Sequence, residues 1–181
     1  MREADLYEGV QAFIEQRFQD RIRPRYGEFN MLSAVTAKSG VPATGHWSKP
    51  DLSLIFVWRP KYNPSWQLDL HGFEVKTFAG CTPASVHEAL SHAAFVHFTH
   101  LVWHCPDWDQ QPGQTRDIYA RCERYGVGLI TFTAPEDADS YVVRLAGQRH
   151  SPSSEIVDEY IETRFERRDL DKFDGWLRGR R

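Results

Sequence analysis

The chain has 181 residues, 41% of them hydrophobic and 26% charged, which is the balance of a globular domain with a core. A formal net charge of −3 excludes a uniformly basic nucleic-acid-binding protein, so contacts with nucleic acid must come from local basic patches. The charged start resembles no signal peptide, and no apolar run approaches the ~20 residues of a membrane span. Together with three widely spaced cysteines, these features predict one cytoplasmic domain with free thiols and no membrane partner.

Residues 3–20 are predicted to form an amphipathic helix, because apolar residues from Leu6 to Phe18 recur at helical spacing. Glu3 projects onto the apolar side of this helix, whereas Glu8 projects to the opposite side. An acid in the position of Glu3 has two interpretations. It either stabilises the N-terminal end of the helix through the helix dipole or faces the sheet as part of a site.

Two acidic motifs border the predicted strands that follow. A strand is expected at 29–37, and Asp51 stands at the start of an apolar, β-branched run. A second run ends in Glu74-Val75-Lys76. Side chains alternate along a strand, so Glu74 and Lys76 share one face while Val75 points into the core. If the two runs pair as a hairpin, Asp51 comes close to Glu74.

This combination of residues resembles the PD-(D/E)xK nuclease superfamily, with Pro50-Asp51 as the first half of the motif and Glu74-Val75-Lys76 as the second. The resemblance implies an α/β, restriction-endonuclease-like fold, a mixed central sheet flanked by helices. Hard oxygen ligands suit Mg²⁺, for which Mn²⁺ can substitute. The alternative interpretation of Glu74 and Lys76 is a solvated charge pair on a strand.

The resemblance also assigns roles to individual residues. Asp51, Glu74 and Lys76 are the expected catalytic residues, and Lys76 would orient or activate the attacking water. The expected metal ligands are the carboxylates of Asp51 and Glu74, the carbonyl of Val75 and a carboxylate from the first helix. For that last ligand Glu3 is favoured over Glu8.

The remaining elements follow in an order that fits this fold. Thr82 is expected to cap a helix that runs to about Phe98, and Thr115 one that Gly126 ends. Further strands are predicted at 100–105, 127–132 and 141–145, and a C-terminal helical extension at 151–178. The resemblance covers about residues 1–145.

Glu88 and His92 lie four residues apart on the helix after the Glu-Val-Lys strand, so they share one face. Members of the family often carry a Gln-x-x-x-Tyr pair there, near the active site. The residue types differ here, so an accessory role and a polar helix face both remain open. The histidines and cysteines of this region lack the spacing of a zinc site.

Basic residues flank these motifs. Lys38 and Lys49 bound a Gly- and Pro-containing loop expected to overhang Asp51, and Arg59 and Lys61 lie at a basic, aromatic hairpin tip. Such residues suit nucleic-acid binding, although an exposed polar turn is the alternative for the tip.

The sequence thus predicts a metal-dependent nuclease that hydrolyses phosphodiester bonds, with DNA as the expected substrate and RNA left open. A chain of this size cuts both strands of a duplex most easily as a homodimer. One alternative is a catalytically inactive module of the same fold that binds nucleic acid or a protein partner. Another is an unrelated α/β domain with surface charges at Asp51 and Glu74.

Overall fold

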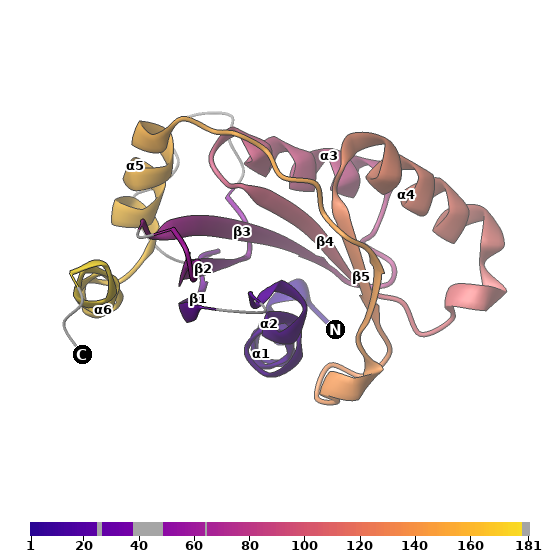
Figure 1. The fold of residues 1–181 in the computed structure, drawn as a ribbon. Helices are drawn as coiled ribbons and strands as arrows, with labels where there is room; N and C mark the ends of the chain where they lie inside the picture. Colours follow the sequence, from indigo (N-terminus) through magenta and orange to yellow (C-terminus); the bar gives the residue numbers. More distant parts are fainter. Residues whose placement is uncertain (25–26, 38–48, 64, 179–181) are drawn as a thin grey trace.

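The computed structural model describes residues 1–24, 27–37, 49–63 and 65–178. In these ranges one open, mixed sheet has its strands side by side in chain order (Figure 1). Strands β1 to β3 are antiparallel to one another, β3, β4 and β5 are parallel, and β6 returns antiparallel to β5. The strands are β1 (Glu28–Val35), β2 (Leu52–Arg59), β3 (Gln67–Lys76), β4 (Phe98–His104), β5 (Gly128–Phe132) and β6 (Val142–Leu145).

The N-terminal helical segment covers one face of the sheet (Figure 1). It begins with a 3-10 turn, Glu3–Asp5, and continues through α1 (Tyr7–Phe13), a π-helical turn (Ile14–Phe18) and α2 (Gln19–Ile22). Its buried apolar residues pack on alternate side chains of β2 and β3, including Leu54 and Val75. This packing confirms the predicted amphipathic helix.

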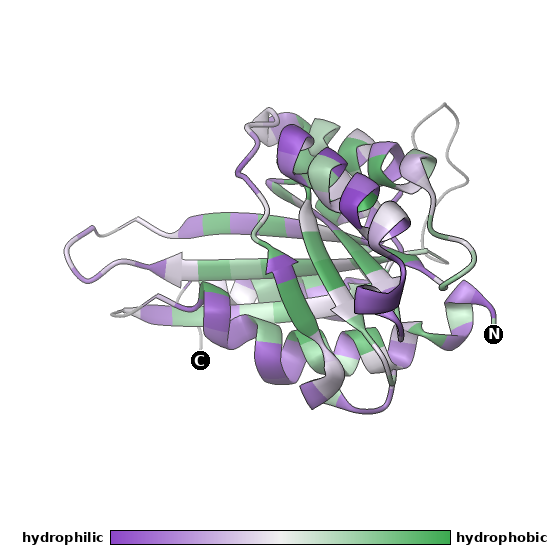
Figure 2. Cartoon of the chain, turned by 90° about the vertical axis from the view of Figure 1, so that its right-hand side faces the viewer, coloured by the Kyte–Doolittle hydropathy of each residue, from purple (hydrophilic) through white to green (hydrophobic). Residues whose placement is uncertain are grey.

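The other helices complete the layers. Helices α3 (Pro83–Ser91) and α4 (Pro112–Tyr125) pack on the opposite face, over β4 and β5. Helices α5 (Ser154–Arg164) and α6 (Arg167–Leu177) pack beside β1 to β3 (Figure 1). Figure 2 shows hydrophobic stretches concentrated in the sheet that these helices cover. The structure therefore confirms an α/β architecture with a mixed central sheet and added C-terminal helices.

Several predicted boundaries are wrong. Helix α3 ends at Ser91 rather than near Phe98, because a short 3-10 turn follows and the His97 N–H already donates to Leu70 O on β3 at 2.8 Å. Helix α4 begins at Pro112, so Thr115 lies inside it and does not cap it. The predicted C-terminal helical extension is present and consists of two helices, α5 and α6.

Other predictions agree with the structure. Gly126 ends α4 with a positive φ of 70°, which a residue without a Cβ adopts at no steric cost. Cys81, Cys105 and Cys122 are buried free thiols. Within the described ranges, every helix falls short of the length and apolar character of a membrane span.

Candidate active site

Main-chain contacts hold Asp51 at the start of β2. Its carbonyl accepts hydrogen bonds from the N–H groups of Thr36 and Ala37, at 2.8 and 3.0 Å. The preceding Pro50 packs over Gly72 of β3, where a Cβ would lie 2.8 Å from the proline Cγ. Because glycine leaves this space, the turn into β2 can lie directly on β3. Asp51 is therefore fixed from both neighbouring strands.

The Asp51 carboxylate bridges the sheet and the first helix. One oxygen, Oδ2, accepts a hydrogen bond from the Val75 N–H at 2.8 Å, and Oδ1 accepts one from the Tyr7 hydroxyl. Continuing the antiparallel register of β2 and β3 places Asp51 opposite Glu74. The pairing predicted from the sequence is thus present, and the two acids are neighbours.

Lys76 connects the remaining acids. Its Nζ lies 2.8 Å from Glu74 Oε1, 2.9 Å from Glu88 Oε2 and 3.4 Å from Glu3 Oε1. We call Glu3, Asp51, Glu74 and Glu88 the acidic cluster. Glu74 and Lys76 are only 9% and 11% exposed, whereas Glu3 and Glu88 are 37% and 47% exposed. The cluster therefore has a buried centre and an accessible rim.

The charges of this site do not balance. Four carboxylates face one ammonium, and burial together with the charge of Asp51 raises the pKa of Glu74 to about 7. Burial also raises the pKa of Asp51, although the Tyr7 and Val75 hydrogen bonds oppose the shift. Burial acts to lower the pKa of Lys76, but the hydrogen bond and charge of Glu74 outweigh it and raise that pKa. Lys76 is therefore protonated at neutral pH.

The helix pair Glu88 and His92 reaches the site, as its spacing suggested. His92 is fully buried, with Nε2 3.6 Å from Glu74 Oε2. Burial, followed by the charge of Lys76, lowers the pKa of His92 to about 3. The imidazole is thus neutral near pH 7 and offers Glu74 a polar neighbour rather than a counter-charge.

The donor chemistry of the cluster fits a hard divalent cation. Carboxylate oxygens of Asp51 and Glu74 and the carbonyl of Val75 are the oxygen ligands that Mg²⁺ takes, and the excess negative charge favours a cation. In the described part of the chain, no group of three or more His, Cys, Asp or Glu side chains is gathered tightly enough to hold a metal. Glu3 contacts the Lys76 ammonium, so metal binding would require the rim carboxylates to move.

The expected nucleic-acid-binding residues are scattered. Lys49 is two residues from Asp51 and partly exposed, and burial followed by the charge of Arg164 lowers its pKa. Arg59 is bonded to Glu28 and lies at the other end of β2, roughly 26 Å from Asp51 along the strand. Lys61 follows it, and Lys38 lies outside the described residues. The structure therefore does not bring the hairpin tip to the acidic cluster.

Of the two acids considered on the first helix, Glu3 lies at the site, and Tyr7 is a further site residue that the sequence analysis did not predict. Glu3 contacts Lys76, whereas Glu8 is exposed. Tyr7, one helical turn after Glu3, bonds to Asp51, and burial followed by that hydrogen bond raises the pKa of Tyr7. The helical spacing of four between Glu3 and Tyr7 was a signal, but it does not reveal which strand end they meet.

Comparisons with known proteins identify no relative. No family model matches the chain, and neither a curated protein nor a solved structure matches it. What the site can do is therefore argued from its own geometry, in which two acids from neighbouring strands, one lysine and a neutral histidine converge at the end of β3.

Proposed function

We propose that this protein is a metal-dependent nuclease with a restriction-endonuclease-like fold that hydrolyses phosphodiester bonds in DNA. One observation carries the proposal. Asp51 and Glu74 lie opposite each other on paired strands, and Lys76, on the same face as Glu74, contacts it at 2.8 Å. The order of the elements supports it, since a helix and three antiparallel strands precede two parallel strands linked by helices.

In this proposal each residue of the site has its own role. Asp51, Glu74 and the Val75 carbonyl would hold Mg²⁺, which supplies Lewis-acid stabilisation of the charge that develops on the phosphate. Lys76 is protonated, so it donates hydrogen bonds to the attacking water or a phosphate oxygen rather than taking a proton. Tyr7 and the Val75 N–H keep the Asp51 carboxylate in a fixed orientation.

The pKa of Glu74 sets a condition on metal binding. A carboxylate must be ionised to ligate a metal, and Glu74 ionises only near pH 7 in the metal-free protein. Affinity for Mg²⁺ is therefore expected to rise with pH towards this value and to level off above it. Glu3 and Glu88 are exposed enough to exchange the Lys76 ammonium for contacts with a bound cation or its water.

The test is cleavage of supercoiled plasmid, linear duplex and single-stranded DNA in Mg²⁺, Mn²⁺ or EDTA. The variants Asp51→Asn and Lys76→Ala are compared with Asp117→Asn, which removes an exposed carboxylate on α4. We expect cutting that requires metal, falls on the order of 100-fold or more in both site variants and is unchanged in the control. Normal cutting by Lys76→Ala would contradict the role of this lysine as a donor to the water or the phosphate.

A wild-type protein that cuts none of these substrates in any metal would contradict the nuclease proposal. DNA binding without cutting would then favour the inactive module. A homodimer, the other expectation for duplex cleavage, is tested on the same samples by sedimentation with and without duplex.

A further inference from the structure

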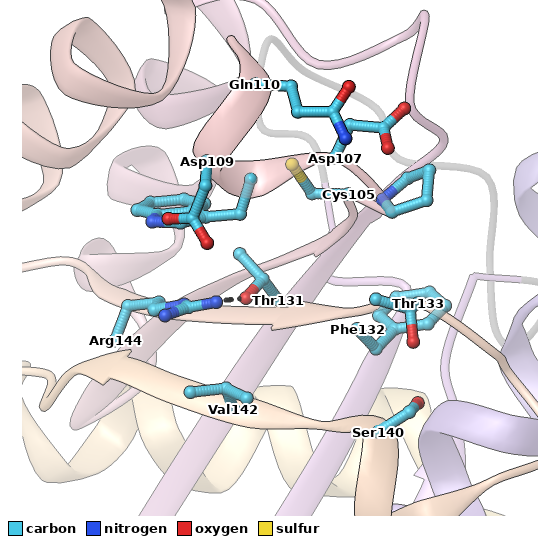
Figure 3. Close-up of a pocket in the computed structure, with 12 residues that line it drawn as sticks. Cys105, Asp107, Asp109, Gln110, Thr131, Phe132, Thr133, Ser140, Val142 and Arg144 are labelled. Atoms are coloured by element: carbon cyan, nitrogen blue, oxygen red, sulfur yellow. Dashed lines mark hydrogen bonds between the residues drawn. The ribbon is translucent and has the colours of Figure 1, made fainter. Parts of the chain in front are cut away.

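A second feature lies on the same end of the sheet as the acidic cluster. A pocket of about 220 Å³ opens between the loop after β4 and the adjoining parts of β5 and β6 (Figure 3). Pockets for drug-sized ligands are roughly 300–1,000 Å³, so this one fits a smaller group, such as a single heterocyclic ring system. None of its lining residues belongs to the acidic cluster.

The strand register places this pocket beside the cluster. Lys76 of β3 pairs with Trp103 of β4, and Trp103 pairs with Thr131 of β5, which lines the pocket. Neighbouring strands are about 4.8 Å apart, so the Cα atoms of Lys76 and Thr131 are separated by roughly 10 Å. A nucleotide next to the scissile phosphate can cover such a distance.

One wall of the pocket is flat and positively charged. The guanidinium of Arg144 stacks 4.6 Å from the centre of the Trp108 ring, and its Nε donates to Thr131 Oγ1 at 3.0 Å. Trp108 in turn packs edge-on against the buried Trp103, with the two ring centres 6.2 Å apart. These contacts fix the plane of Arg144 and leave its terminal nitrogens as donors for a ligand. In-plane arginine donors of this kind form bidentate pairs with the edge of a base.

The 3-10 turn that carries Trp108, Trp108–Gln110, also brings acceptors to the pocket. Asp109 and Gln110 come from the loop after β4, and Figure 3 shows the Asp109 carboxylate directed towards the side of the pocket that holds Arg144. Among the contacts of the described residues, Arg144 bonds to Thr131 and stacks on Trp108 and forms no ion pair with Asp109. A ligand in the pocket can therefore meet both the arginine donors and the carboxylate.

We propose that this pocket binds a guanine base of the substrate strand, unstacked next to the scissile phosphate. Guanine presents two acceptors, O6 and N7, to an arginine on one edge, and two adjacent donors, N1–H and the 2-amino group, to a carboxylate on another. Adenine places an acceptor nitrogen at the position that would face Asp109. The position of the base relative to the cut rests on the proposed function, whereas the recognition of guanine does not.

The test measures binding in EDTA, where no cleavage is expected. Fluorescence anisotropy compares a single-stranded thymine homopolymer with the same strand carrying one central guanine. The variants are Arg144→Gln and the exposed Asp109→Asn, with Arg121→Gln on α4 as a control that removes an arginine paired with Asp117. Circular dichroism checks that each variant is folded.

We expect the wild type to prefer the guanine strand. Arg144→Gln should weaken binding of that strand about 5- to 100-fold, and Asp109→Asn should reduce the preference about 10-fold. The control should bind as the wild type does. Equal affinity for the two strands, no binding of either strand, or a preference that survives in both variants would overturn the inference.

The two proposals fail separately. Metal-dependent cutting without any guanine preference would leave the nuclease intact and refute the pocket assignment. Guanine-selective binding without cutting in any metal would support the pocket and refute the nuclease.

Discussion

Replacing Glu74 with glutamine is expected to stabilise the metal-free protein at pH 8. Glu74 is 9% exposed and is surrounded by acids, so its ionised form is disfavoured in the folded state. Glutamine has nearly the same shape and never ionises. Lys76 keeps its contacts with Glu3 and Glu88 in the variant. The substitution therefore removes an unfavourable charge while the ammonium retains partners.

The magnitude follows from the pKa. Burial and the charge of Asp51 raise the pKa of Glu74 from 4.5 to about 7, which corresponds to about 3 kcal/mol. Because the folded-state pKa is raised, this stability is present below pH 4.5 and is lost as the pH rises through 7. The substitution also removes the ion pair between Glu74 and Lys76, which offsets part of this gain. We therefore expect the free energy of unfolding of Glu74→Gln to exceed that of the wild type by about 1–3 kcal/mol at pH 8.

Urea unfolding in EDTA at pH 5, 6, 7 and 8 measures the difference. The gain of Glu74→Gln should grow with pH over this range. The matched control is Glu88→Gln, which also removes a carboxylate from Lys76 but at a site that is 47% exposed, so its difference should stay small. If Glu74→Gln is less stable than the wild type at pH 8, the ion pair with Lys76 outweighs the burial of Glu74, and the reasoning is wrong.

Two further predictions concern residues around the site. Gly72→Ala should lower the free energy of unfolding, measured with urea, by about 1–3 kcal/mol and should lower any cleavage activity, because the added Cβ displaces Pro50 and with it Asp51. A variant with the stability and activity of the wild type would contradict this prediction. The buried rings of His71 and His100, which share a 3.0 Å hydrogen bond, should remain neutral at pH 5, since burial lowers both pKa values, that of His100 to about 3. Imidazole NMR signals that titrate near pH 6.5 would show that this pair is accessible to solvent.

Much of the centre of the site follows from local sequence. The alternation of side chains fixes the shared face of Glu74 and Lys76, and a hairpin is the simplest way to join two consecutive strands, which brings Asp51 to Glu74. Helical spacing similarly places Glu88 and His92 together. These relations involve residues close in sequence or governed by a strict period, so they could be predicted without a structure.

The missing parts depend on packing between distant segments. Tyr7 meets Asp51 across 44 positions, a contact that no local pattern encodes. The Arg144–Trp108 stack joins a loop and a strand that are separated by an entire helix and strand. The end of α3 was misjudged because the apolar residues up to Phe98 fit a helix, whereas pairing of His97 with Leu70 of β3 already extends the chain there.

The docking of the first helix affects the order in which its contacts can form while the chain is being synthesised. Phe13 stacks on Tyr141 with ring centres 4.4 Å apart, and Arg17 bonds to Asp139 at 2.6 Å, so the segment made first is anchored by residues made much later. A nascent chain that stops short of Tyr141 can already pack this helix on β2 and β3, but it lacks the contacts with Tyr141 and Asp139 that complete the docking.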